Sequence, residues 1–226
     1  MLDSVKEWYY DSANKKIYIW LENDENPLSH TVEVSGSGNA VSSTGKSYLE
    51  IKDISVKKSG DYGINLYNSP NVIIRNMEVY DSGDHGVYVY SSANTQISNS
   101  VIHNSVTNGI NIMNNSHNAI VTNNEVLNSG NIGKKEKNSK GAIRIYRANN
   151  ATIQGNVVKN SGYTGIDFNY STGHTIKNNV VENSCLILAD GGGIYTWGAT
   201  STNSSITGNI IINSVGGYEG DGDGYK

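Results

Sequence analysis

Apolar and polar residues alternate along most of this chain in short runs that recur about every two dozen residues. Each run opens with a small residue and continues as an alternating pentad. The pentads are Gly63–Tyr67, Gly86–Tyr90, Gly109–Met113, Ala142–Tyr146, Gly165–Asn169 and Gly193–Trp197. Alternation over four or five positions is typical of β-strands, and no stretch has the spacing of an amphipathic helix. The sequence therefore predicts an all-β chain of short strands.

The pentads recur at intervals of 23, 23, 33, 23 and 28 residues. Within each period a second apolar pair and a two-residue tag follow, as in Ile153–Val158 and Asn160-Ser161. Repeats of this length are typical of solenoids, whose units cannot bury their apolar faces alone. We predict a single-stranded right-handed parallel β-helix with three strands per coil. Equivalent residues then stack at about 4.8 Å along the sheets.

Stacking places equivalent apolar residues in two files inside the coils. The first file is Ile64, Val87, Ile110, Ile143, Ile166 and Ile194, and the second is Leu66, Val89, Ile112, Ile145 and Phe168. The first residue of the tag forms a column of its own, made of Asp81, Asn104, Asn128, Asn160, Asn183 and Asn213. Stacked Asn side chains form ladders of amide hydrogen bonds. The abundance of Asn is thus expected to be structural.

The first forty residues lack the repeat. Trp8-Tyr9-Tyr10 and Ile17–Leu21 flank a polar turn and predict a β-hairpin. We expect its aromatic side chains to cover an open end or side of the β-helix, with a sugar-binding platform as the alternative. The expected organisation is a hairpin with its lead-in over residues 1–40 and about seven coils over 41–226, together one domain. Residues 224–226 stand where another pentad would begin, so we expect a piece of a longer protein, truncated at its C-terminal end.

The composition argues against several classes of function. The formal net charge is −4, and no basic stripe is available to neutralise phosphates, so nucleic acid is not an expected partner. No apolar segment is long enough to span a membrane, and Met1 is followed by no secretion signal. Cys185 is the single cysteine, and the histidines lack metal-ligand spacing. We therefore predict no metal centre and no cofactor.

Candidate binding residues stand on the outward positions of the pentads. One outward column contains Tyr88, Arg144, Asp167 and Tyr195, and the other contains Tyr90, Tyr146 and Trp197. Polar groups beside a file of aromatic rings suit an extended chain of sugars, whose ring faces stack on aromatic side chains. The alternative is that these rings only fill a surface that favours β-structure. We favour a polysaccharide or oligosaccharide partner.

Carboxylates gather towards one end of the same face. Asp167 lies in a pentad, Asp190 precedes the next one, and Asp221 and Asp223 occupy the turn one coil later. Asp190 and Asp221 each stand three residues before a glycine that opens a strand, so we expect them to stack. Glycoside hydrolysis requires two carboxyl groups with different pKa values. Asp223 or Glu219 in place of one of them would give a larger distance between the two carboxyl groups. The alternatives are ordinary Asp-Gly turns or Ca²⁺ binding by the stacked Asp side chains.

Basic and titratable residues on this face allow a second chemistry. His85 precedes the second pentad and is a candidate general base or substrate-binding residue. Arg144 lies one coil from Asp167, so an ion pair is the simplest expectation, and a clamp for a substrate carboxylate is the second. Lys140 ends the long interval beside Arg144. These three residues are the candidates for lyase or epimerase chemistry on uronates.

The hairpin, the Asn-Ser repeats and the segment Asp190–Gly198 together resemble the right-handed parallel β-helix proteins of the pectate-lyase-like superfamily. The chain is most similar to bacterial glycoside hydrolases of the β-xylosidase and α-fucosidase type. That resemblance implies a secreted or cell-surface protein and catalytic roles for Asp190 and for Asp221 or Asp223. Two further hypotheses stay open: a polysaccharide lyase or epimerase, and a non-catalytic binding or structural β-helix. An uncapped coil end also predicts end-to-end self-association.

Overall fold

The computed structural model describes residues 2–5, 7–33, 35, 38–131, 141–198 and 200–214. The chain divides into two compact units, residues 1–34 and 35–226. The first unit contains a two-stranded antiparallel sheet of β1 (Trp8–Asp11) and β2 (Lys16–Ile19), followed by the 3₁₀ turns η1 (Glu22–Asp24) and η2 (Pro27–Ser29). The predicted hairpin is thereby confirmed.

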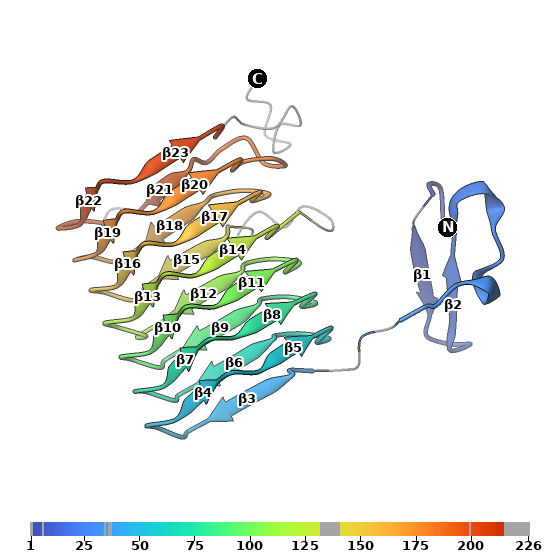
Figure 1. Ribbon diagram of the computed structural model, residues 1–226, viewed down its shortest axis with the longest axis horizontal. Helices are drawn as coiled ribbons and strands as arrows, with labels where there is room; N and C mark the ends of the chain where they lie inside the picture. Colours follow the sequence, from blue (N-terminus) through green and yellow to red (C-terminus); the bar gives the residue numbers. More distant parts are fainter. Residues whose placement is uncertain are drawn as a thin grey trace. The chain divides into compact units, whose positions relative to one another are not determined.

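The second unit is a right-handed parallel β-helix, as the repeat predicts. Its three walls are seven-stranded parallel sheets, and each coil contributes one strand to each wall (Figure 1). The pentads form the first wall: β3 (Val41–Thr44), β6 (Ile64–Tyr67), β9 (Val87–Tyr90), β12 (Ile110–Met113), β15 (Ile143–Tyr146), β18 (Ile166–Asn169) and β21 (Ile194–Trp197). We call the outer surface of this wall the pentad face.

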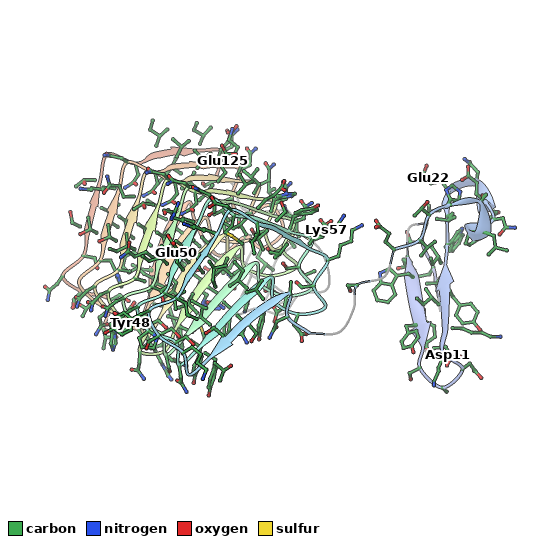
Figure 2. The ribbon with its side chains drawn as sticks, turned by 60° about the horizontal axis from the view of Figure 1, so that its bottom comes forward. Asp11, Glu22, Tyr48, Glu50, Lys57 and Glu125 are labelled. Carbon is green, nitrogen blue, oxygen red and sulfur yellow. The ribbon has the colours of Figure 1, made fainter. Side chains whose placement is uncertain are left out.

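The other two walls are built from three-residue strands. The second wall consists of β4 (Glu50–Lys52), β7 (Ile73–Arg75), β10 (Gln96–Ser98), β13 (Ile120–Thr122), β16 (Thr152–Gln154), β19 (Thr175–Lys177) and β22 (Ser205–Thr207). The third consists of β5 (Ser55–Lys57), β8 (Glu78–Tyr80), β11 (Val101–His103), β14 (Glu125–Leu127), β17 (Val157–Lys159), β20 (Val180–Glu182) and β23 (Ile210–Ile212). Charged side chains on these walls, such as Glu50 and Glu125, point outward (Figure 2).

The register stacks equivalent residues as the sequence predicts. Ile110 pairs with Val87 on one side and Ile143 on the other, and Ile112 pairs likewise with Val89 and Ile145. All four of these partners are fully buried. The interior is a narrow apolar column in which β-branched side chains from successive coils touch. Burying them is the main stabilising contribution to this unit.

Turns between the walls depend on the left-handed conformation. Many Asn residues adopt it, among them Asn68, Asn71 and Asn76 of a single coil, with φ of 50°, 59° and 52°. Asn tolerates this region because its short polar side chain bonds locally. The glycine that opens a pentad has a different role. A Cβ at Gly86 would lie 2.4 Å from Ile102 Cγ2 and 2.6 Å from the carbonyl oxygen of Gly109, so a side chain does not fit.

Asn ladders run along the β-helix. In the predicted column, Nδ2 of Asn104 donates to Asp81, and Asn128, Asn160, Asn183 and Asn213 each donate to the preceding coil. A second, interior ladder was not predicted: Asn124, Asn156, Asn179 and Asn209 are joined by bonds of 2.9–3.0 Å. Their side chains also donate to backbone carbonyls across the turn. The interior therefore contains a satisfied amide column as well as apolar files.

Candidate functional site

The middle coils of the pentad face carry a buried group of polar side chains. We call His85, Asn111, Arg144 and Asp167 the polar centre. Asn111 and Arg144 are direct register partners, as are Arg144 and Asp167. His85 reaches this row from the turn before β9, where its Nε2 lies 2.9 Å from Nδ2 of Asn111. Parallel register thus brings side chains from four coils together.

The polar centre is less exposed than alternation predicts for an outward column. Asn111 is 2% exposed, Asp167 4% and His85 6%. The cause is that side chains from the preceding turns fold over the strands. His85 covers Asn111, and Thr164 donates to Asp167 Oδ2 at 2.7 Å.

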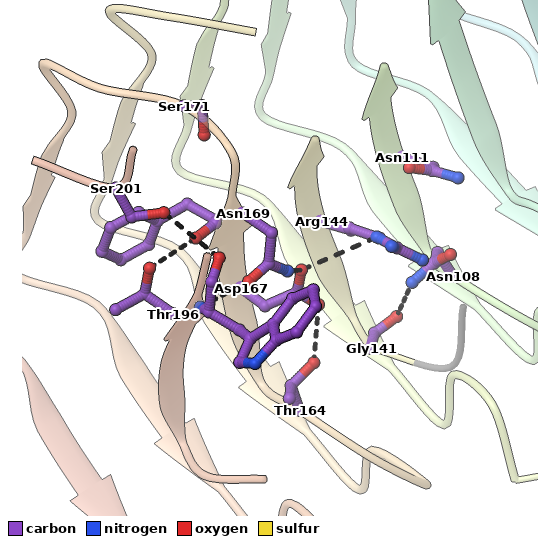
Figure 3. A network of polar contacts seen from close by, with 12 residues as sticks. Asn108, Asn111, Gly141, Arg144, Thr164, Asp167, Asn169, Ser171, Thr196 and Ser201 are labelled. Atoms are coloured by element: carbon purple, nitrogen blue, oxygen red, sulfur yellow. Dashed lines mark hydrogen bonds and ion pairs between the residues drawn. The ribbon is translucent and has the colours of Figure 1, made fainter. Parts of the chain in front are cut away.

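Asp167 is surrounded by donors (Figure 3). Thr164 Oγ1 donates to one carboxylate oxygen and Asn169 Nδ2 to the other, each at 2.7 Å. Arg144 Nε lies 3.7 Å from Oδ1, so the expected ion pair is present. Burial nevertheless raises the pKa of Asp167 to about 6, against the opposing effects of Arg144 and Thr164. This carboxyl group therefore titrates close to neutral pH.

His85 is held in its neutral form. Burial lowers its pKa to about 4, Asp84 opposes this shift, and the charge of Arg144 adds to it. Nδ1 lies 2.5 Å from Thr107 Oγ1, which also bonds to Asp84. Nδ1 also accepts from the backbone N–H of Asn108 at 3.3 Å, and the Thr107 hydroxyl donates to the Asp84 carboxylate. Tyr62 and Tyr88 stack on the ring, with centroids at 5.4 and 5.2 Å.

Several buried polar atoms on this face lack a hydrogen-bond partner among the described residues. They are Oδ1 of Asn65, Oδ1 of Asn108, Oδ1 of Asn111 and Nε of Arg144. Leaving such atoms unpaired is costly, and a group of them on one surface is typical of a ligand site. Three acceptors and one cationic donor suit a ligand that carries hydroxyl and carboxylate groups.

Aromatic rings flank the polar centre along the face. Tyr67 and Tyr90 stack with centroids 5.1 Å apart and planes 6° apart. Beyond the centre, Tyr170 contacts Tyr146 and Trp197 edge-on, at 5.6 and 5.3 Å. All five rings predicted to bind substrate belong to strands of this wall: Tyr88, Tyr90, Tyr146, Tyr195 and Trp197.

Tyr163 and Tyr195 mark a second acidic neighbourhood. Their ring centroids are 6.2 Å apart. Burial raises the pKa of both phenols, and the charges of Asp190 and Asp167 raise them further. Asp190 is exposed in the turn before β21, while Asp167 is buried one coil earlier. Asp190 and Asp167 thus share the same phenol neighbours.

The predicted stacking of Asp190 with Asp221 falls outside the described residues, as do Asp223, Glu219 and Lys140. Residue-by-residue reading missed Tyr62, Thr107, Asn108 and Thr164. A signal was available: Tyr62, Asn108 and Thr164 stand one residue before a pentad, as the candidate His85 does, and Thr107 stands two residues before one. Position in the repeat, rather than residue type, identifies them.

The sequence profile of the NosD family, described as periplasmic copper-binding protein, matches residues 4–220. The chain belongs to the NosD family. No curated protein matches this NosD-family chain by sequence. The described residues contain no helix with the length and apolar character needed to cross a membrane.

Solved structures share the fold of this NosD-family chain. The periplasmic alginate epimerase AlgG is 20% identical, with a TM-score of 0.54, over 75% of this chain and 46% of that one. An alginate lyase from Paenibacillus sp. str. FPU-7 is 15% identical, with a TM-score of 0.57, over 82% and 78%. A mannuronan C-5 epimerase A-module from Azotobacter vinelandii is 15% identical, with a TM-score of 0.50, over 77% and 64%. The chain spans about half of the AlgG chain, and these likenesses show the fold.

The family is described as copper-binding, so the His, Cys, Asp and Glu side chains are the candidate metal ligands. Among the described residues, no three His, Cys, Asp or Glu side chains come close enough to share a metal ion. Cys185 is a buried single thiol, and both ring nitrogens of His85 are bonded to Thr107 and Asn111. The described part of the chain does not fit a copper cage of His and Cys ligands.

Proposed function

We propose that the polar centre binds a polysaccharide of acidic sugars and transfers a proton at the carbon next to the sugar carboxylate. The observation that carries this proposal is the presence of a neutral buried imidazole beside a partly buried cation. His85 and Arg144 flank Asn111 on successive coils, and the charge of Arg144 reaches the imidazole. Proton abstraction beside a carboxylate needs a base and a positive charge for the developing anion.

Arg144 and His85 have different roles in this reaction. Arg144 pairs with the sugar carboxylate, and its Nε, which lies 3.7 Å from Asp167 and has no hydrogen-bond partner among the described residues, provides a donor. The neutral imidazole of His85 takes the proton as the carbon–hydrogen bond breaks, after the substrate replaces its contact with Asn111, and the electron pair moves into the carboxylate, beside Arg144. Return of a proton from water on the opposite side inverts the sugar, whereas loss of the neighbouring glycosidic oxygen, which takes a proton from water, cleaves the chain. The first step is the same in both outcomes.

Other observations support an acidic polysaccharide as the partner. Unpaired amide oxygens on the face suit sugar hydroxyls, and the flanking rings suit sugar faces. Structural neighbours carry names of alginate epimerases and an alginate lyase. The NosD description as periplasmic supports a location outside the cytoplasm.

Glycoside hydrolysis is the second candidate, favoured by the pKa of Asp167. A carboxyl group that titrates at about 6 is suited to donate a proton to a leaving oxygen. Asp190, exposed and near the same phenols, would be the partner carboxylate. The Asp190–Asp221 pair, with Asp221 outside the described residues, stays a prediction.

The test is incubation with polyuronates, in ordinary and in heavy water. Ultraviolet absorbance indicates an unsaturated product, deuterium at the carbon next to the carboxylate indicates inversion, and new reducing ends without absorbance indicate hydrolysis. We expect absorbance or deuterium, lost in His85→Gln and in Arg144→Gln. His103→Gln and Arg75→Gln, on other walls, are the matched controls and should retain activity. Reducing ends alone, dependent on Asp167, would favour hydrolysis instead.

A further inference from the structure

The residue after each pentad strand adopts the left-handed conformation in every coil. The residues are Gly45, Asn68, Ser91, Asn114, Arg147, Tyr170 and Gly198, with φ between 34° and 104°. Backbone bonds between coils confirm their equivalence, as from Asn68 N to Tyr90 O and from Arg147 N to Asn169 O. Glycine and Asn tolerate this region, but long or aromatic side chains are strained there. Three coils carry neither glycine nor Asn there: Ser91 is short, whereas the consecutive coils of Arg147 and Tyr170 place long side chains at this position.

These two exceptions build one cluster with their neighbours, which we call the arginine–aromatic cluster: Tyr146, Arg147, Tyr170 and Trp197. The guanidinium carbon of Arg147 lies 5.1 Å from the ring centroid of Tyr146 and 5.8 Å from that of Tyr170. Trp197 is 60% exposed and packs edge-on against Tyr170. Strained backbone positions cluster at ligand-binding and active sites.

The charge in this cluster is not compensated within the described part of the chain. Arg144 also lies 5.1 Å from the Tyr146 ring, but Arg144 has Asp167 as its counter-ion. Arg147 is exposed, and its contacts among the described residues are with rings rather than carboxylates. Two guanidinium groups lie around one ring, and the carboxylate of Asp167 is paired with only one of them, which leaves a place for an anion.

The cluster is physically joined to the polar centre. Oδ1 of Asn169 accepts from the backbone N–H of Trp197 at 2.6 Å, and Nδ2 of the same residue donates to Asp167 at 2.7 Å. A ligand chain lying over Arg144 along the face therefore reaches Arg147 and Trp197 next.

We propose that the arginine–aromatic cluster is a second subsite, which binds the neighbouring acidic sugar of the same polysaccharide. Arg147 pairs with that sugar's carboxylate, and the exposed indole of Trp197 stacks on its ring. This inference rests on the proposed function and narrows the substrate to polymers with consecutive acidic sugars. The left-handed backbone of Arg147 is strained, and this conformation directs its guanidinium group towards the carboxylate of the second sugar.

The test is calorimetric titration with an oligouronate, with a single uronic acid and with a carboxyl-reduced oligosaccharide. In Arg147→Asn, which restores the residue used at positions 68 and 114, we expect binding of the oligouronate to weaken about tenfold. Binding of the single uronic acid, which fills one subsite alone, should change little. The melting temperature should stay or rise, since Asn suits this conformation. Arg147→Lys should retain part of the affinity.

Three results would overturn the inference. Unchanged affinity in Arg147→Asn, with weakened binding in Arg144→Gln, removes the second subsite and leaves the proposed function standing. Absence of binding in the unmodified chain removes both. Equal affinity for the carboxyl-reduced or a sulfated oligosaccharide shows that Arg147 does not select carboxylates.

Discussion

At the residue scale, burial acts in opposite directions on the two titratable side chains of the polar centre. It raises the pKa of Asp167 and lowers that of His85, because it disfavours the charged form of each. Alternation in the sequence predicted that Asp167 and Arg144 stand outward and pair. It could not predict their burial, because the covering side chains come from turns whose conformation depends on packing.

The pKa of Asp167 predicts a pH-dependent stability. Its value rises from 3.8 to about 6 on folding, so the folded state holds the proton more tightly. The stabilisation is complete below pH 3.8 and is lost as the pH rises through 6. It corresponds to about 3 kcal/mol. Urea unfolding at several pH values should show this loss between pH 4 and 7 in the unmodified chain. An equal loss in Asp167→Asn would contradict the assignment.

His174 predicts the opposite dependence. Its ring is 1% exposed, accepts from the backbone N–H of Ala151 and contacts Ser171. Burial lowers its pKa from 6.5 to about 4. Its contribution is therefore present above pH 6.5 and is lost as the pH falls towards 4, by about 3 kcal/mol. His174→Gln should weaken this acid sensitivity in thermal unfolding, whereas His103→Gln should leave it unchanged. Identical pH profiles for both variants would show that His174 is not its source.

At the element scale, the strands and their register could be predicted from the sequence. In a stacked repeat, each residue pairs with the equivalent residue of the coil before and the coil after. The pentads matched the strands of the first wall within one residue, as with β9 (Val87–Tyr90). The interior Asn ladder did not follow, because a polar residue at an inward position contradicts alternation unless its partners on adjacent coils are known. Asn156 shows the reason. Its amide bonds to Asn179, to Asn124 and to the carbonyl of Val121.

The two ladders should differ in their contribution to stability. Asn156→Ala leaves buried donors and acceptors unpaired on both adjacent coils, so we expect a loss of about 2–4 kcal/mol in the free energy of unfolding. Asn160 lies in the surface ladder and is partly solvated. Glycine keeps its left-handed backbone, so we expect Asn160→Gly to lower the free energy of unfolding by about 1 kcal/mol. Chemical denaturation measures both. Equal losses would contradict a special role for the interior ladder.

At the scale of the whole molecule, the last described coil leaves interior positions uncovered. Ile206 and Ile211 are in register with the buried Ile176 and Val181, yet they are 49% and 48% exposed. We propose that a second copy of the chain covers this end, in line with the self-association expected from sequence. Sedimentation velocity should show association that increases with concentration and is reduced in Ile206→Asp. A monomer at all concentrations would contradict it.

The central claim is that parallel register assembles an acidic-polysaccharide site from His85, Asn111, Arg144 and Asp167. Calorimetric titration of an oligouronate into the unmodified chain, Arg144→Gln and Arg75→Gln tests it most directly. We predict saturable binding that weakens at least about tenfold in Arg144→Gln and is unchanged in Arg75→Gln. Absence of binding, or equal affinity in all three proteins, would contradict the claim.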